Sequence, residues 1–103
     1  MQFMVRIEVR VPGEWSEAQV KTAYAAEVER AHELMQAGII LRLWRVAGAR
    51  ANFGLWEADS LEELHSAISS LPLFPFLEPT VTPVIEHPSI SPYKEKYGTL
   101  PVM

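Results

Sequence analysis

The chain has 103 residues, of which 49% are apolar, and it carries a formal net charge of −4 with no cysteine. This length fits one domain, and the lack of cysteine excludes disulfides, thiolate catalysis and zinc–cysteine sites. The acidic balance excludes nucleic acid as an expected partner, and no apolar run approaches the roughly 20 residues of a membrane span. We therefore expect a soluble cytoplasmic protein, whose rich aromatic content indicates a subunit interface.

Strict alternation of apolar and polar residues over 2–11 predicts a half-buried strand, which Pro12-Gly13 ends. Ser16, with Gln19 three residues later, has the pattern of a capping box and predicts a helix over 17–36. Gly38 is placed to stop this helix. The side chains expected on its inner face are Val20, Tyr24, Glu27, Val28, Ala31, Leu34 and Met35.

The middle of the chain predicts a hairpin followed by a second helix. Strands over 39–46 and 51–57 flank a turn at 48–50. Ser60 and Glu63 form a second predicted capping box, and the helix that follows should run to about Ser70. Its expected inward residues are Leu61, Leu64, Ala67, Ile68 and Leu71.

The last third of the chain is rich in proline. Residues 71–76 (LPLFPF) are apolar but contain two prolines, which predicts a packed loop and not a central strand. A fourth strand is expected near 81–86, where Pro83 favours an edge position. The tail, residues 91–103, carries Tyr93, Tyr97, Leu100 and Val102, and we expect it to pack on a neighbouring subunit.

The predicted order is β-α-β-β-α-β. This pattern is typical of an α+β, ferredoxin-like fold with a four-stranded antiparallel sheet and two helices on one face. We therefore expect one domain over residues 1–90, of the dimeric α+β barrel type, followed by the tail.

Glu27 is the first candidate for chemistry. It shares a helix face with Val20, Tyr24 and Ala31, and a carboxylate on an apolar stripe loses hydration, which raises its pKa toward the range of a general acid or base. The alternative is that Glu27 lies at the edge of the stripe and reaches solvent. His65, beside Leu64 on the second helix, is either a boundary residue or a catalytic one.

Arg45 and Asn52 are the candidates on the hairpin. Arg45 shares a strand face with Leu43, and a guanidinium there needs an anionic partner, which is either Glu27 or a substrate carboxylate. Asn52 offers a neutral donor for an enolate oxygen or pairs with a turn. Trp44 and Trp56 provide flat apolar walls or ordinary packing. The histidines at 32, 65 and 87 lack metal-ligand spacing, so no metal site is expected.

The central part of the chain also resembles the muconolactone Δ-isomerase family. The similarity spans about residues 1–90. Its most specific pieces are Leu43-Trp44-Arg45 with Ala47-Gly48, Ala51-Asn52, Leu64-His65, Leu71-Pro72-Leu73-Phe74-Pro75 and His87-Pro88-Ser89, and the LPLFP segment is unusual for a loop between a helix and a strand.

The resemblance implies an enzyme that isomerises muconolactone to 3-oxoadipate enol-lactone in the catechol branch of aromatic degradation. It implies no cofactor and no metal, and subunits assembled as dimers into decamers. Glu27, Arg45, Asn52 and His65 match family positions. The resemblance therefore implies Glu27 as the proton carrier, Arg45 as the partner of the substrate carboxylate or of dienolate charge, and Asn52 and His65 as donors or orienting groups.

Five positions depart from the family pattern. Met4 stands where members often carry His, Tyr24 where they carry Lys, Ala26 where they carry Asp, and Ala49-Arg50 where they carry His-Tyr. Either Arg50 supplies the missing cation and Tyr24 the missing donor, or the substrate has changed. The runner-up functions are thus an isomerase or cyclase acting on another small cyclic metabolite, and a non-catalytic small-molecule binding protein.

Overall fold

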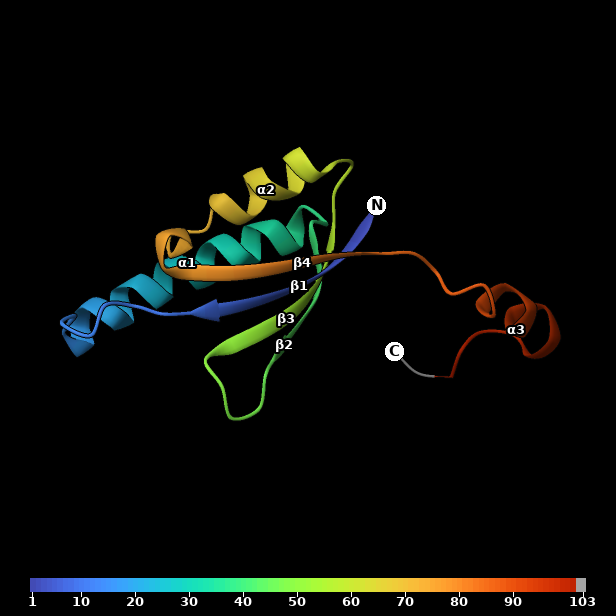
Figure 1. Ribbon diagram of the computed structural model, residues 1–103, viewed down its shortest axis with the longest axis horizontal. Coiled ribbons are helices and arrows are strands. Elements are labelled where there is room, and N and C mark those ends of the chain that lie inside the picture. Colours follow the sequence, from blue (N-terminus) through green and yellow to red (C-terminus); the bar gives the residue numbers. More distant parts are fainter. Residues whose placement is uncertain (102–103) are drawn as a thin grey trace.

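The computed structural model describes residues 1–101 and has the expected α+β architecture (Figure 1). The helices α1 and α2 lie on one face of an antiparallel sheet of strand order β2-β3-β1-β4, as in the ferredoxin-like fold. The elements are β1 (Gln2–Val9), α1 (Glu17–Gln36), β2 (Ile40–Arg45), β3 (Ala51–Glu57), α2 (Leu61–Ser69), β4 (Leu77–Val84) and α3 (Ile90–Tyr97).

The core lies between the sheet and the two helices. Phe3 and Val5 of β1 are fully buried, and Phe3 stands opposite Trp56 of β3 in the register. Leu34 of α1 and Leu64 of α2 close the core from above, each 1% exposed. The alternation seen in the sequence thus directs one face of β1 into the core.

The cap of α1 confirms its prediction. The Ser16 hydroxyl accepts from the Gln19 backbone N–H at 3.1 Å, and the Gln19 side chain accepts from the Ser16 N–H at 2.7 Å. Gly38 follows the helix with a φ of 75°, a conformation that glycine adopts without steric cost. On the expected inner face, Met35 is 39% exposed, and Val28 is 49% exposed although it still lines the space between α1 and the sheet.

Two predictions for α2 were wrong in detail. The Ser60 hydroxyl accepts from the Glu63 N–H at 3.1 Å, but the Glu63 carboxylate accepts from the Asp59 N–H and not from Ser60. The hydrogen bond that the N3 side chain accepts therefore comes from the residue before the N-cap and not from the N-cap itself. Leu61 is 55% exposed and not inward, because it lies in the first turn, at the rim of a groove.

The strand boundaries also differ from those predicted. The first strand ends at Val9 and not at residue 11. The Arg10 N–H still donates to the Phe76 carbonyl at 2.8 Å, but Phe76 belongs to a 3₁₀ turn over Phe74–Phe76, so the pairing with β4 stops at Val9 and Leu77. β4 covers Leu77–Val84 instead of 81–86, and it lies at the sheet edge as Pro83 indicated. Pro79 and Pro83 have the same parity along β4, so their missing N–H groups can both face the open edge.

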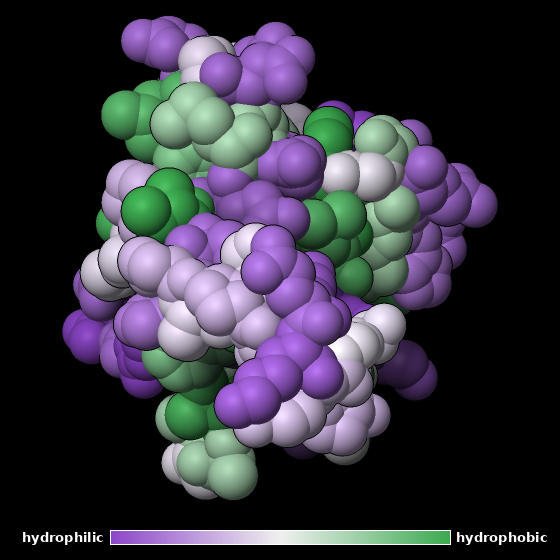
Figure 2. All heavy atoms as spheres, turned by 90° about the vertical axis from the view of Figure 1, so that its right-hand side faces the viewer, coloured by the Kyte–Doolittle hydropathy of each residue, from purple (hydrophilic) through white to green (hydrophobic). Residues whose placement is uncertain are grey.

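The tail contains a helix that the sequence analysis did not predict. α3 begins at Ile90 and projects away from the sheet, which gives principal extents of 56 × 30 × 22 Å (Figure 1). Tyr97 is 63% exposed, and its ring lies 5.1 Å from that of Tyr93. Seen from the side on which α3 projects, apolar patches surround a largely polar centre (Figure 2). Val102 lies outside the described residues.

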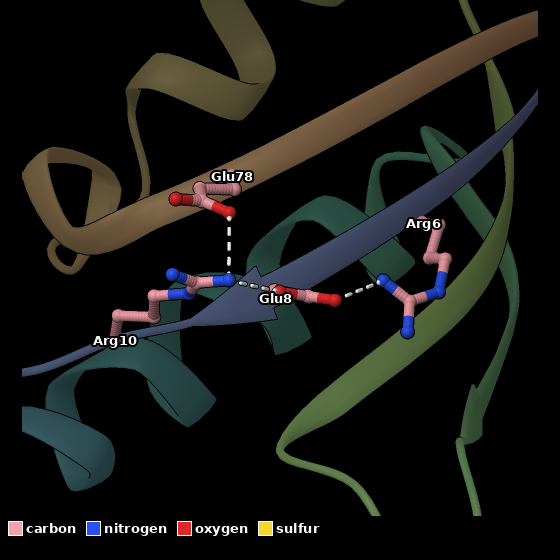
Figure 3. Close-up of polar contacts among 4 residues, drawn as sticks. All are labelled: Arg6, Glu8, Arg10 and Glu78. Atoms are coloured by element: carbon pink, nitrogen blue, oxygen red, sulfur yellow. Dashed lines mark hydrogen bonds and ion pairs between the residues drawn. The ribbon is translucent and has the colours of Figure 1, made fainter.

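No helix of residues 1–101 covers the second face of the sheet, which carries both charged and apolar side chains. The Glu8 carboxylate pairs with Arg6 at 2.7 Å and with Arg10 at 3.0 Å, and Arg10 reaches Glu78 of β4 at 3.5 Å (Figure 3). Hydrogen bonds from Arg6 and then Arg10 hold the pKa of Glu8 below its usual value. Phe53 is 39% exposed beside this chain of charges. These side chains, with Trp44 of β2, form the open face of the sheet.

Candidate functional site

A cavity of about 330 Å³ lies between α1 and the end of the sheet formed by β2 and β3. Apolar side chains of β1, β2 and the LPLFPF segment form much of its wall. The cavity exists because α1 is closely packed only at Leu34, near its C-terminal end, whereas its middle turns are half-buried. Side chains that can act on a ligand also line it: Tyr24, Glu27, Arg45, Asn52 and Trp56.

Glu27 is held by a backbone group of the LPLFPF segment. Its carboxylate accepts a hydrogen bond at 3.0 Å from the backbone N–H of Leu73, which is 46 residues away in the chain. Burial raises the pKa of the Glu27 carboxyl, and the Leu73 N–H only partly offsets this effect. A carboxyl with a raised pKa and a fixed orientation is suited to take and return a proton near neutral pH.

The LPLFPF segment supplies this N–H from a rigid position. Leu71 and Leu73 are 6% and 1% exposed, and a 3₁₀ turn over Phe74–Phe76 follows them. The Phe74 N–H donates to the Leu71 carbonyl at 2.9 Å, which leaves the Leu73 N–H directed toward Glu27. The sequence identified this segment as packed but did not reveal its contact with Glu27. Its unusual pair of prolines was the available signal.

Arg45 and Asn52 stand opposite each other in the β2–β3 ladder, on the face that carries the helices. Within residues 1–101, Arg45 forms no ion pair with a carboxylate, so the pairing with Glu27 that the sequence left open is not formed. The Asn52 Oδ1 atom is buried and has no hydrogen-bond partner among the same residues. The guanidinium and the amide can therefore both bind a ligand.

Three aromatic residues predicted for the site, Tyr24, Trp44 and Trp56, also line this cavity. Tyr24 precedes Glu27 by three positions, so the two side chains lie on the same face of α1. Trp56 is 1% exposed, and its indole nitrogen has no partner among the described residues. Trp44 is 48% exposed and contributes to the cavity only at its rim, since its strand position opposite Phe53 places it on the open face.

His65 and Arg50 do not reach the cavity. His65 follows the buried Leu64 by one position, and this turns it toward β4, where it lines a separate apolar groove and lies edge-on to Phe74. Arg50 is exposed in the hairpin loop, and its backbone carbonyl accepts from the Val9 N–H at 3.0 Å. Within this chain, these two predicted residues therefore do not lie together with the others.

The raised pKa of Glu27 predicts how folding stability depends on pH. The folded state holds this proton more tightly than the unfolded state, so its stabilising contribution is complete below the ordinary glutamate pKa of 4.5. That contribution is lost as the pH rises through the folded pKa. Glu27→Gln keeps an acceptor for the Leu73 N–H without the charge. We expect this variant to resist urea better than the unmodified chain at pH 7. The difference should vanish below pH 4.5, and a constant difference at every pH would contradict the prediction.

The departures from the family pattern are distributed unevenly around the site. Tyr24 lines the cavity, whereas Met4 lies on the open face, Ala26 is exposed on α1, and Ala49 and Arg50 lie in the hairpin loop. Four of the five substituted positions therefore lie outside the wall of the cavity.

Two classes of feature are missing from the described part of the chain. Among residues 1–101, no group of three or more His, Cys, Asp or Glu side chains is placed to hold a metal ion. None of the helices in this range is long and apolar enough to cross a membrane.

Comparison with known proteins gives a consistent result. The model of the family described as muconolactone delta-isomerase matches residues 1–90. The muconolactone Delta-isomerase of Cupriavidus pinatubonensis is 38% identical over 89 residues, which are 86% of this chain and 97% of that protein. The enzyme of the same name from Pseudomonas aeruginosa is 36% identical over 86% of this chain and 93% of its own length.

Solved structures agree with these matches. A crystal structure of muconolactone isomerase superposes with a TM-score of 0.80 at 36% identity, covering 86% of this chain and 93% of that one. A 5-chloro-2-hydroxyhydroquinone dehydrochlorinase from Burkholderia phenoliruptrix superposes with a TM-score of 0.65 at 22% identity, covering 84% and 96%. The second likeness concerns the fold alone.

Proposed function

The chain belongs to the muconolactone delta-isomerase family and is an isomerase. From that premise we propose that it converts muconolactone to 3-oxoadipate enol-lactone in the catechol branch of aromatic degradation. The observation that carries the proposal is the convergence of Glu27, Arg45 and Asn52 on one cavity, with burial raising the pKa of the Glu27 carboxyl. This set supplies a proton carrier, a cation and a neutral hydrogen-bonding group, as the reaction requires.

The proposed reaction moves one proton and one double bond within the substrate. The Glu27 carboxylate takes a proton from a carbon of the lactone ring, and the electron pair of that bond is delocalised toward the ring carbonyl as a dienolate. The protonated Glu27 then returns the proton to another ring carbon. Nothing is oxidised or reduced, and the atoms balance without a cofactor.

The other side chains of the cavity hold the substrate during this transfer. Arg45 binds the substrate carboxylate, for which a guanidinium offers two parallel donors. Asn52 acts on the oxygen that gains charge in the dienolate. Tyr24 lies beside Glu27 as an orienting donor, and Trp44 and Trp56 contribute flat walls at the rim and the base. His65 and Arg50 are outside the proposed catalytic set of one subunit.

The proposal includes self-association. The open face exposes Trp44 and Phe53 beside the charged chain of Glu8, and α3 projects beyond the sheet. An uncovered sheet face of this kind is suited to pack against a second copy, which gives the dimeric α+β barrel, and dimers then assemble into a decamer. Residues 1–90 act as the isomerase domain, and the tail 91–103 packs on a neighbouring subunit.

The proposed location is the cytoplasm, since a chain without cysteine needs no oxidising compartment.

The experiment that tests the function follows the ultraviolet absorbance of muconolactone after the purified protein is added. Conversion to the enol-lactone at a rate proportional to enzyme concentration is the expected result. No conversion under these conditions would overturn muconolactone as the substrate and would favour another small cyclic metabolite. Light scattering on the same preparation gives the mass of the assembly.

Arg45→Met is expected to weaken substrate binding more than it slows chemistry. The variant keeps an apolar stem in the wall of the cavity and loses the charge-assisted hydrogen bonds, each worth about 1.5–3 kcal/mol. We therefore expect KM to rise about 10- to 100-fold with a smaller change in kcat. Arg42→Met, on the same strand but on the open face, is the matched control for activity. A KM unchanged by Arg45→Met would remove Arg45 from carboxylate binding.

A further inference from the structure

The Trp56 indole N–H has no role in the proposed reaction as described by the residues Glu27, Arg45 and Asn52. The indole N–H is buried, and it has no hydrogen-bond partner among residues 1–101 although the ring lines the cavity. Buried N–H groups in proteins are nearly always paired, because an unpaired one loses its bond to water without replacement. An unpaired donor at the wall of a binding cavity therefore indicates a partner that arrives with the ligand.

Gly54 explains how the indole comes to occupy this position. A Cβ atom added at Gly54 would lie 2.5 Å from the Trp56 Nε1 atom and 2.9 Å from its Cδ1 atom. The N–H edge of the ring therefore lies directly over Gly54, two residues back along β3 in the direction of Asn52. Only a residue without a side chain leaves this space, and the φ of Gly54 is not positive, so room and not backbone conformation is the reason for glycine here.

The surroundings of the N–H place it with the ligand-binding groups. Asn52, Gly54 and Trp56 alternate along β3, so all three share the face that lines the cavity. Leu43 stands opposite Gly54 in the β2–β3 register and also lines the cavity. Leu43 is 41% exposed, so the wall of the cavity opposite Gly54 is accessible to solvent.

The Asn52 Oδ1 atom is likewise buried and unpaired, two residues from Gly54. A half-turn of an amide group exchanges its oxygen for its nitrogen with almost no change of shape. Asn52 can therefore offer a second N–H on the same strand face. Two neutral donors on one face are suited to a single oxygen atom on which negative charge develops.

We propose that the Trp56 indole N–H donates a hydrogen bond to the ring carbonyl oxygen of the bound lactone, beside Asn52, and that Gly54 is the positioning residue that leaves room for it. This inference rests on the proposed function and assigns Trp56 a polar role in place of a purely apolar wall. The bond strengthens as Glu27 removes the ring proton and charge moves onto the carbonyl oxygen. Trp56 thereby stabilises the dienolate more than it stabilises the ground state.

The first test is Trp56→Phe, which keeps an aromatic ring and removes the N–H. We expect kcat to fall about 10²-fold, with KM within about threefold, because the interaction is stronger in the transition state. Trp15→Phe is the matched control. The Trp15 ring packs edge-on against the Phe76 ring, with 5.0 Å between the ring centroids, and Trp15 does not line the cavity. A Trp56→Phe enzyme with kcat within twofold of the unmodified one, or an equal loss in the control, would overturn the proposal.

The second test observes the N–H directly and does not depend on turnover. The chain has three Trp residues, so three indole signals are expected in a ¹H–¹⁵N spectrum, and the Trp56 signal is the one that Trp56→Phe removes. Muconolactone is added to the Glu27→Gln protein, in which turnover is suppressed. The Trp56 proton should move downfield while the Trp15 proton stays in place. An unmoved Trp56 signal overturns the proposal whether or not the unmodified enzyme turns over the lactone.

These two tests separate this inference from the proposed function. A downfield shift in a protein without isomerase activity would disprove the proposed reaction and leave Trp56 as a ligand donor. Turnover of muconolactone with an unmoved indole signal would support the proposed reaction and disprove the hydrogen bond from Trp56.

Gly54→Ala tests the positioning role. The added methyl group displaces the indole, so kcat should fall by nearly as much as in Trp56→Phe. In a Trp56→Phe background the same substitution should change kcat less than about twofold, because no N–H remains to be misplaced. Equal losses in both backgrounds would show that Gly54 acts through strand packing and not through the indole.

Discussion

Replacing Glu27 by Gln is expected to lower kcat by about 10²- to 10⁴-fold, the range that a positioned acid or base contributes. Gln has the size of Glu and can still accept the Leu73 N–H, so the cavity keeps its shape while the proton carrier is lost. Initial rates of lactone conversion, measured over a range of substrate concentrations, give kcat and KM separately. Because binding is left to Arg45 and the cavity walls, KM should change little.

The control for this prediction lies on the same helix. Glu29 is exposed on α1, two residues after Glu27, so Glu29→Gln removes the same charge without touching the cavity. In the unmodified enzyme, kcat/KM should fall as the pH drops through the raised pKa of Glu27, since only the ionised carboxyl accepts a proton. An active Glu27→Gln enzyme, or equal effects at positions 27 and 29, would remove Glu27 from the mechanism.

Phe3→Ala is expected to reduce the free energy of unfolding by about 3–5 kcal/mol. Phe3 is fully buried at the centre of the sheet, between Trp56 of β3 and Pro83 of β4 in the register. The loss combines the transfer of an aromatic ring out of the core with the cavity left behind. A domain of this size has only about 5–15 kcal/mol of stability in total, so the variant should be close to unfolding at 37 °C.

Urea denaturation followed by circular dichroism measures this change. A fall in the urea concentration at the transition midpoint, with an unchanged dependence of the free energy on urea, would show that stability has changed. The compactness of the unfolded state would then be the same in both proteins. Ile85→Ala, at a residue that is 92% exposed just after β4, should stay within about 0.5 kcal/mol of the unmodified chain. A loss below about 1 kcal/mol for Phe3→Ala would contradict the core assigned to this face of β1.

The site was only partly predictable, because its members were found by local pattern. Glu27 and Arg45 were recognisable as charged groups on otherwise apolar faces of a helix and a strand. Asn52 was a candidate as a neutral donor on the next strand, and Tyr24 as a substituted position of the family pattern. The structure places all four on one cavity. His65 had the same local signature, yet it faces a groove beside β4. A pattern along one helix shows that a residue lies near the core, but not which neighbouring element it faces.

Some features of the site have no local signature. The Leu73 N–H that orients Glu27 comes from 46 residues away, and the space over Gly54 that holds the Trp56 indole exists only once β3 is packed in the sheet. A backbone N–H looks the same in every sequence, and a glycine in a strand has several possible uses. These contacts therefore had to be read from the folded chain.

Elements with local signals were predictable from the amino-acid pattern alone: the alternating first strand, the capping box that begins α1, the hairpin, and the order of the strands with the first two helices. These depend on side-chain period and on hydrogen bonds over three or four residues, which a sequence displays directly. The start of β4 among its prolines and the set of polar residues that share a cavity became known only from the folded chain. Both depend on partners distant in the chain, because an edge strand is defined by its neighbour and a cavity by the elements that enclose it.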